Sequence, residues 1–220
     1  MIARALLVAV VLACFAVAAH AGPHDATSRR SFDDVGHWTA VFDDPKRDAW
    51  QKPDEIVRAL AITPGSTVAD LGAGTGYLSR RLSVAVGENG TVLAVDPEPN
   101  LVAHLRSRAE REKTANVVPV LASTDNPRLP ATGVDVVLVL DTYHHIDDRP
   151  AYFEKMKRAL RPNGRVAVID WQKRELPVGP DLGHKLAREQ VVEEMKMAGY
   201  ELTSEPDVLP YQYFLIFTPR

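Results

Sequence analysis

Short apolar runs alternate with amphipathic stretches along most of the chain. The apolar runs are rich in valine, leucine and alanine and predict β-strands at residues 68–71, 91–95, 116–121, 134–140 and 165–171. The stretches around them space apolar residues three and four apart and predict helices at residues 53–61, 77–86, 100–113, 148–160 and 188–198. This alternation predicts a doubly wound α/β fold, in which helices cover both faces of a mostly parallel sheet.

Two of these strands also carry positional information. The run at residues 134–140 is almost wholly apolar, which is typical of a strand buried on both faces. Pro119 interrupts the run at residues 116–121, and proline cannot donate a hydrogen bond to a central ladder, so we expect this strand at a sheet edge. Residues 201–209 and 211–218 complete the pattern and predict a closing β-hairpin.

The first predicted strand leads directly into a glycine-rich turn. Because Gly72, Gly74 and Gly76 remove every second Cβ, a ligand can approach the backbone closely, and the helix that follows points free N–H groups at the same place. Asp70 stands just before the turn, and Asp96 ends the next strand, where an acid can accept hydrogen bonds from both hydroxyls of a ribose. The pattern predicts a nucleotide or cofactor pocket. A tight turn without a ligand would not explain Asp96.

The glycine spacing separates two classes of nucleotide-binding protein. The chain has D-x-G-x-G-x-G, whereas dinucleotide-binding folds have G-x-G-x-x-G, which makes room for a pyrophosphate. The carboxylate of Asp70 beside the turn suits a ligand with a positive charge near its backbone contacts. An NAD(P)-binding oxidoreductase is therefore an alternative that the spacing opposes.

These features together resemble the class I S-adenosylmethionine (SAM)-dependent methyltransferases, over residues 54–220. The resemblance implies SAM as cofactor and a Rossmann-like sheet of seven strands in the order 3-2-1-4-5-7-6, with strand 7 antiparallel. It also implies that the glycine turn holds the methionine part of SAM, that the acid of the second strand holds the ribose, and that residues after the third strand contact the adenine. The cofactor-binding residues implied in this way are Asp70, Gly72, Ala73, Gly74, Gly76, Tyr77, Asp96, Pro97, Ser123, Thr124 and Asp141.

The loop after the fourth strand is where this family places groups beside the acceptor. Asp141, His144 and His145 lie in this loop, and since imidazole titrates near neutral pH, the histidines are candidate bases or acceptor-positioning groups. Alternatively, one histidine packs against the next helix and the other hydrogen-bonds locally. We predict no metal: catechol-type relatives hold Mg²⁺ with two aspartates and an asparagine, and although Asp141 and Asp170 match, Trp171 replaces the asparagine.

Residues 22–53 are polar, and we expect an irregular arm there. In the family such a segment often folds over the SAM pocket and shapes the acceptor site, so Arg47, Trp50 and Gln51 are candidate substrate contacts. His184 lies in a loop that can overhang the same pocket. In the alternative interpretation, Trp50 covers one edge of the core and His184 is a surface residue.

The first 21 residues have the pattern of a signal peptide. Arg4 supplies the positive charge, residues 5–18 are apolar, and residues 19–21 form an A-x-A cleavage site, so we expect an exported protein, periplasmic or secreted, with no membrane span after cleavage. A transmembrane anchor and a lipoprotein cysteine at Cys14 are the alternatives. Cleavage would remove Cys14, the single cysteine, and with it any thiol chemistry, including cysteine-based methylation of arsenite-like substrates.

The resemblance implies in-line attack of an acceptor nucleophile on the methyl group of SAM, for which the protein mainly supplies alignment and water exclusion. We expect a small-molecule acceptor. The formal net charge of −3 gives no electrostatic footprint for nucleic acid. Since SAM is made in the cytoplasm, the export pattern also favours an alternative, a non-catalytic module of the same fold that binds a ligand or partner.

Overall fold

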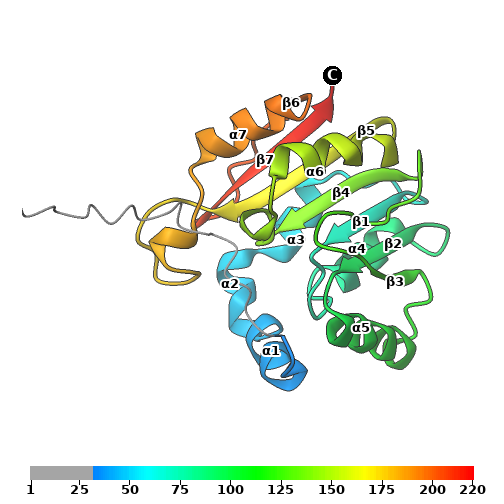
Figure 1. Cartoon of the computed structure of the whole chain (residues 1–220). Coiled ribbons are helices and arrows are strands. Elements are labelled where there is room, and N and C mark those ends of the chain that lie inside the picture. The colour runs from blue at the N-terminus through cyan, green and yellow to red at the C-terminus, as the bar shows by residue number, and fades with distance from the viewer. Residues whose placement is uncertain (1–31) are drawn as a thin grey trace, which may run out of the picture.

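The predicted strands pair into one sheet in the computed structural model, which describes residues 32–220. The strands are β1 (Thr67–Leu71), β2 (Thr91–Asp96), β3 (Val117–Leu121), β4 (Val134–Leu140), β5 (Leu160–Trp171), β6 (Tyr200–Ser204) and β7 (Gln212–Pro219). Their order is β3-β2-β1-β4-β5-β7-β6, and β7 is antiparallel to both of its neighbours (Figure 1). The predicted strand order and the antiparallel last strand are confirmed, and Pro119 lies in an edge strand as expected.

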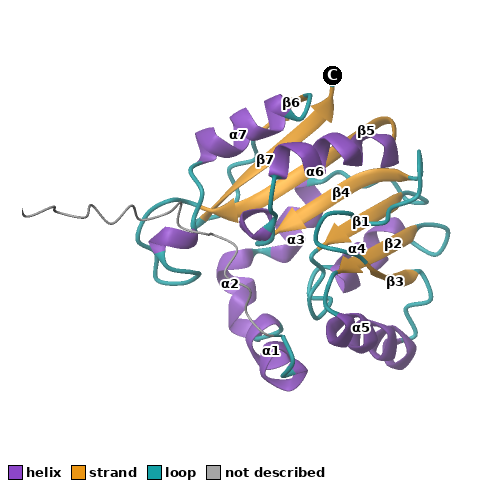
Figure 2. Ribbon diagram, in the orientation of Figure 1, coloured by secondary structure: helices purple, strands orange, loops and turns teal. Residues whose placement is uncertain are grey.

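Helices cover both faces of this sheet. The α-helices are α1 (Val35–Phe42), α2 (Asp48–Gln51), α3 (Pro53–Ala59), α4 (Ser79–Val86), α5 (Pro99–Glu112), α6 (Arg149–Met156) and α7 (Arg188–Met197). The 3₁₀ turns are η1 (Pro45–Arg47), η2 (Tyr143–His145), η3 (Lys157–Ala159) and η4 (Leu182–His184). Figure 2 shows α6 and α7 on one side of the sheet and α3 and α4 on the other. The doubly wound α/β prediction is therefore correct.

The central position of β4 in the sheet explains why its sequence is almost entirely apolar. Val137 and Val139 belong to the hydrophobic core beneath α6 and α7, whereas Val136 and Leu138 belong to the core beneath α3 and α4. All four side chains have at most 1% of their surface exposed. Because β1 and β5 flank β4 in parallel, the carboxyl ends of these strands meet at one edge of the sheet, where a site can form.

The described part of the arm, residues 32–53, is mostly helical, so the prediction of an irregular segment is wrong there. The side chain of Asp34 accepts a hydrogen bond from the backbone N–H of His37 at 2.9 Å and caps α1. Asp44 accepts one from the backbone N–H of Lys46, also at 2.9 Å, and Pro45 follows it at the first helical position of η1. These two capping signals are legible in the sequence and outweigh its polar composition.

Four predicted boundaries also change. The helix after the glycine turn begins at Ser79, later than predicted, and β6 ends at Ser204 instead of residue 209. The helix predicted to reach Leu160 ends as α6 at Met156, and β5 already begins at Leu160. The early part of β5 is irregular, with Asn163 at a φ of 68° and a register shift against β4.

The predicted signal peptide, with Cys14, lies outside the described residues. Within residues 32–220, none of the helices has the length and apolar character needed to span a bilayer.

Candidate active site

The glycine turn is held open by its own backbone geometry. Gly72, Gly74 and Gly76 have φ angles of 74°, 57° and 90°, a region that L side chains rarely adopt. A Cβ on Gly72 would overlap the side chain of Thr142. The N–H groups of Gly72 and Ala73 donate to the carbonyl of Val95 at 2.8 and 3.0 Å, so the turn is fixed to the end of β2. The result is a shallow backbone cradle at the carboxyl edge of the sheet.

Two buried carboxylates stabilise this cradle. Asp96 accepts hydrogen bonds from the backbone N–H of Gly74 at 2.8 Å and of Glu98 at 2.9 Å. Asp70 accepts one from the hydroxyl of Ser79 at 2.6 Å, which ties the end of β1 to the start of α4. Burial raises the pKa of each of these aspartates to about 6, although the hydrogen bonds oppose the shift.

The cradle forms one end of a cavity of about 710 Å³. The predicted site residues that line it are Arg47, Trp50, Asp70, Gly72, Ala73, Gly74, Tyr77, Asp96, Pro97, Ser123, Thr124, Asp141, His144, His145 and His184. Gly76 and Gln51 are not among its lining residues, and Gln51 is fully buried. The structure therefore brings most of the predicted residues together around one space.

The arm supplies an aromatic wall that the sequence did not assign to the site. Phe32, Trp38 and Phe42 pack ring against ring, with centroids 4.9 to 6.3 Å apart, and all three line the cavity. The ring of Phe42 would lie 3.5 Å from a Cβ on Gly74, so the wall covers the glycine turn itself. The spacing of Trp38 and Phe42, one helical turn apart, is the signal that could have indicated this wall.

Two carboxylates fasten the arm to the glycine turn. Asp43 accepts from the hydroxyl of Thr75 at 3.0 Å and pairs with Arg108 of α5. Asp48 accepts from the hydroxyl of Tyr77 at 2.6 Å and from Arg81 at 2.6 Å. Figure 1 shows α1 beside α5 accordingly. The aromatic wall is therefore anchored on the same elements that form the cradle.

A polar network links the arm to the other end of the cavity. Arg47 donates to Asp141 at 2.9 Å and to Gln51 at 3.0 Å. Gln51 donates to the side chain of Gln212 at 2.6 Å, and Gln212 in turn donates to Asp141. Burial raises the pKa of Asp141 to about 6, although Arg47 lowers it. Gln212 was not predicted, and nothing near it in the sequence indicates this role.

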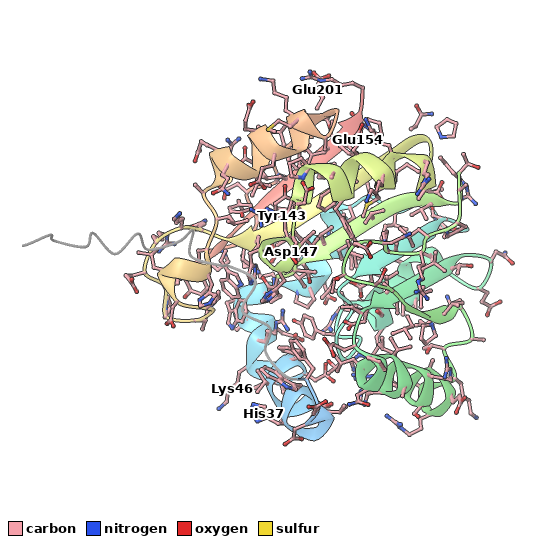
Figure 3. All side chains as sticks on the ribbon, viewed as in Figure 1. His37, Lys46, Tyr143, Asp147, Glu154 and Glu201 are labelled. Atoms are coloured by element: carbon pink, nitrogen blue, oxygen red, sulfur yellow. The ribbon has the colours of Figure 1, made fainter. Side chains whose placement is uncertain are left out.

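The two predicted histidines lie at this end in η2. His144 is buried and its Nδ1 lies 2.9 Å from Oδ1 of Asp170, at the end of β5. His145 is exposed, and its ring centroid is 4.0 Å from that of His144. Figure 3 shows Tyr143 and Asp147, which bracket the pair, near the centre of the molecule. Asp170 was considered only as a metal ligand and pairs instead with His144.

Charge in the cavity is predominantly negative. Asp70, Asp96 and Asp141 all line it, and Arg47 pairs with one of them. With pKa values near 6 these carboxylates are mostly ionised at neutral pH, so the cavity favours a ligand that carries positive charge. In the described part of the chain, histidine, cysteine and acidic side chains do not gather in threes that could hold a metal ion.

Comparison with known proteins relates this site to others. Residues 68–164 match the family model for a methyltransferase domain. An uncharacterized methyltransferase of Mycobacterium tuberculosis is 34% identical over 139 residues, which cover 62% of this chain and 53% of the relative. The ubiquinone/menaquinone biosynthesis C-methyltransferase of a Shewanella species is 30% identical over 118 residues, which cover 53% of this chain and 47% of the relative. The chain spans about half the length of these curated relatives.

A solved structure covers more of the fold. A SAM-dependent methyltransferase from Aquifex aeolicus superposes with a TM-score of 0.79 and 26% identity, over 84% of this chain and 97% of that one.

Proposed function

Because the chain belongs to the class I SAM-dependent methyltransferases, we propose that it transfers the methyl group of SAM to a small-molecule acceptor bound in the cavity. One observation carries the proposal: the glycine cradle and the histidine turn face the same space of about 710 Å³. That volume is typical of a small-molecule or cofactor pocket. A cofactor and an acceptor bound there would lie next to each other.

The residues present fit SAM. When bound, SAM supplies a methyl group on a positively charged sulfur, which is already a good leaving group. Gly72 and Gly74 bring the backbone of the cradle to the cavity wall, and Asp96 retains acceptor capacity beyond its two backbone hydrogen bonds. The negative cavity suits the positive charge of the sulfonium. We assign the methionine part to the cradle and the ribose to Asp96.

The remaining residues would align the acceptor and exclude water. The aromatic wall of Phe32, Trp38 and Phe42 covers the cradle, which limits access of water to the transferring methyl group. Trp50 and Trp171 line the acceptor end, with ring centroids 5.4 Å apart. His144 is the candidate base in that end, since it is the buried histidine of the pair.

Calorimetric titration tests the proposal. The protein would be titrated with SAM, S-adenosylhomocysteine and NAD⁺, beside an Asp96→Ala variant and, as control, Glu110→Ala on the exposed face of α5. We expect micromolar binding of the two sulfur ligands, weakened at least about tenfold in Asp96→Ala and unchanged in the control, because a charged hydrogen bond contributes roughly 1.5 to 3 kcal/mol. Absence of binding to both would refute the proposal, and binding of NAD⁺ alone would assign the chain to the oxidoreductases.

A further inference from the structure

A smaller hollow lies at the edge of the sheet opposite the candidate active site. Its volume is about 350 Å³, at the small end of the range for ligand pockets. It lies where β1, β4 and β5 begin, since these strands are parallel and their carboxyl ends form the other edge (Figure 1). The turn at residues 63–66 lines it, together with Asp135 of β4 and with Arg161, Asn163 and Arg165 of β5.

The charge of this hollow is opposite to that of the candidate active site. The guanidinium groups of Arg161 and Arg165 line it, and Asp135 is the one carboxylate among its described lining residues. Two positive charges and one negative charge leave one net positive charge, although the whole chain has a formal net charge of −3. A positive hollow on an acidic protein favours an anionic ligand.

The positive charge of Arg165 is left largely uncompensated. Its side chain is half-buried, and Nη2 donates to the backbone carbonyls of Leu60 and Ala61, at the end of α3. Burial lowers the pKa of Arg165, and the charge of Asp135 opposes this shift only in part. Within residues 32–220 this guanidinium makes no ion pair, and its Nε and Nη1 atoms donate to no protein group. These N–H groups are therefore donors without an acceptor.

Arg161 is oriented by the carboxylate of Asp135. The Oδ2 atom of Asp135 accepts from Nη1 of Arg161 at 2.5 Å and from the backbone N–H of Thr67 at 2.8 Å. The other donors of Arg161, Nε and Nη2, have no protein acceptor in the described part of the chain, and Oδ1 of Asp135 has no protein donor there. The pair thus holds one guanidinium in place and keeps both donors and an acceptor for a ligand.

We propose that this hollow binds a phosphate monoester, with the phosphate group bound by Arg161 and Arg165. The outer oxygens of a tetrahedral phosphate can accept hydrogen bonds from two guanidinium groups at once. A carboxylate has only two oxygens, which lie in one plane and suit a single guanidinium. This inference goes beyond the proposed methyl transfer and does not depend on it.

The rest of the hollow favours a hydroxylated organic part, as in a sugar phosphate. A Cβ on Gly65 would meet nothing within 4 Å, so there is open space beside the turn. The hydroxyl of Ser66 donates to the carbonyl of Thr63 at 2.5 Å, which leaves its oxygen free to accept. Oδ1 of Asp135 is the second acceptor. Hydroxyl groups of a sugar can donate to both.

Calorimetric titration of the full chain at low ionic strength tests the proposal. The probes are ribose 5-phosphate, inorganic phosphate, ribose and succinate. We expect a Kd below about 1 mM for ribose 5-phosphate, weaker binding of inorganic phosphate, and no binding of ribose. A Kd above about 10 mM for both phosphates would overturn the proposal. Tighter binding of succinate than of ribose 5-phosphate would show that the site takes carboxylates, and the phosphate assignment would fail.

Substitutions test the two arginines. Arg161→Gln should weaken binding of ribose 5-phosphate at least about tenfold, because it removes charged hydrogen bonds to the ligand. Arg165→Gln should do the same, but it also weakens the end of α3, so Arg161→Gln decides the test if Arg165→Gln does not fold. Arg158→Gln is the matched control: Arg158 is exposed in η3 and does not line the hollow. Its affinity should stay within about twofold of wild type. Equal losses in Arg158→Gln and Arg161→Gln would mean that net charge, and not the site, binds the anion.

NMR locates the ligand, since the candidate active site could also take a ribose phosphate. In ¹⁵N-labelled protein, ribose 5-phosphate should shift the backbone amide signals of Gly65 and Ser66. Shifts confined to Gly72 and Gly74 would place the ligand in the candidate active site and overturn the proposal. Neither result bears on SAM binding, so this inference and the proposed function stand or fail separately.

Discussion

The two ends of the cavity are built in different ways. At the cofactor end, the partners are close in sequence: Asp70 pairs with Ser79, nine residues on, and Asp96 with Gly74, 22 residues back. At the acceptor end, Arg47 reaches Asp141 across 94 residues. The first end is one strand–turn–helix–strand unit, whereas the second exists only when distant segments have come together. The cofactor end can therefore stay constant while the acceptor end is rebuilt.

The largest expected effect is a loss of catalytic rate at the acceptor end without a loss of SAM binding at the cofactor end. His144→Ala should lower kcat by roughly 10²- to 10⁴-fold, the usual contribution of a general base, while SAM affinity stays within about threefold. Methyl-transfer kinetics and calorimetry on the same variant measure both quantities. His145→Ala, an exposed neighbour, should cost less than about tenfold. A larger loss in His145→Ala than in His144→Ala would reverse the assignment.

A glycine substitution in the cradle should weaken SAM binding and leave the acceptor end intact. Gly72→Ala forces a Cβ into the side chain of Thr142 at a φ of 74°, so the cradle must shift, and SAM affinity should fall about 100-fold. Gly65→Ala is the matched control, because its φ of 88° is similarly strained but a Cβ there meets nothing within 4 Å. Calorimetry should show normal SAM affinity in that control. Equal losses in both variants would mean that strain, and not the cradle, accounts for the effect.

Acid should weaken cofactor binding and stabilise the empty protein. Burial raises the pKa of Asp70, Asp96 and Asp141 to about 6. Each of these carboxyl groups stabilises the folded protein when it is protonated. This contribution to the free energy of unfolding is fully present below the ordinary pKa of 3.8 and is lost as the pH rises through the folded-state pKa of about 6. SAM attraction needs the ionised form, so SAM affinity should fall about tenfold from pH 7 to pH 5.

Two controls sharpen this pH experiment. S-adenosylhomocysteine lacks the positive charge on sulfur and should show a smaller pH dependence of its affinity. Asp70→Asn should flatten the SAM profile, because it removes one of the titrating carboxylates. An affinity for SAM that is independent of pH between 5 and 7 would contradict the electrostatic account of the cofactor end.

The smallest effect concerns the fastening between the arm and the cradle. Asp43→Asn weakens the contacts to Thr75 and Arg108, so the SAM dissociation rate should rise roughly threefold to fivefold, about 1 kcal/mol. Stopped-flow displacement of bound SAM measures this rate. Glu112→Gln removes a more exposed partner of the same Arg108 and should leave the rate unchanged. An unchanged rate in Asp43→Asn would show that the arm does not retain the cofactor.

The difference between local contacts at the cofactor end and long-range contacts at the acceptor end explains which residues could be predicted from the sequence. Hydrophobic periodicity predicted the strands, and Asp70, the glycines and Asp96 were legible because they lie within one local unit. Gln212 could not be found, since its contacts with Gln51 and Asp141 depend on tertiary packing across 161 and 71 residues. Asp170 and His144 were each noticed, but their pairing was not predicted, because it depends on the adjacent ends of β4 and β5 in the folded sheet. The helical arm was missed although Asp34 and Asp44 signalled its caps.

The long reach of the arm also sets an order of assembly. On the ribosome, the arm is made before every group that fastens it: Arg108 follows Asp43 by 65 residues, and Gln212 follows Gln51 by 161. The arm can dock on the sheet only after the cradle and α5 have been synthesised, and its network closes only when β7 emerges. The first described segment to be translated thus cannot complete its contacts until nearly the whole chain has been made, and until the glycine turn has been made the three aromatic side chains of its wall have nothing to cover.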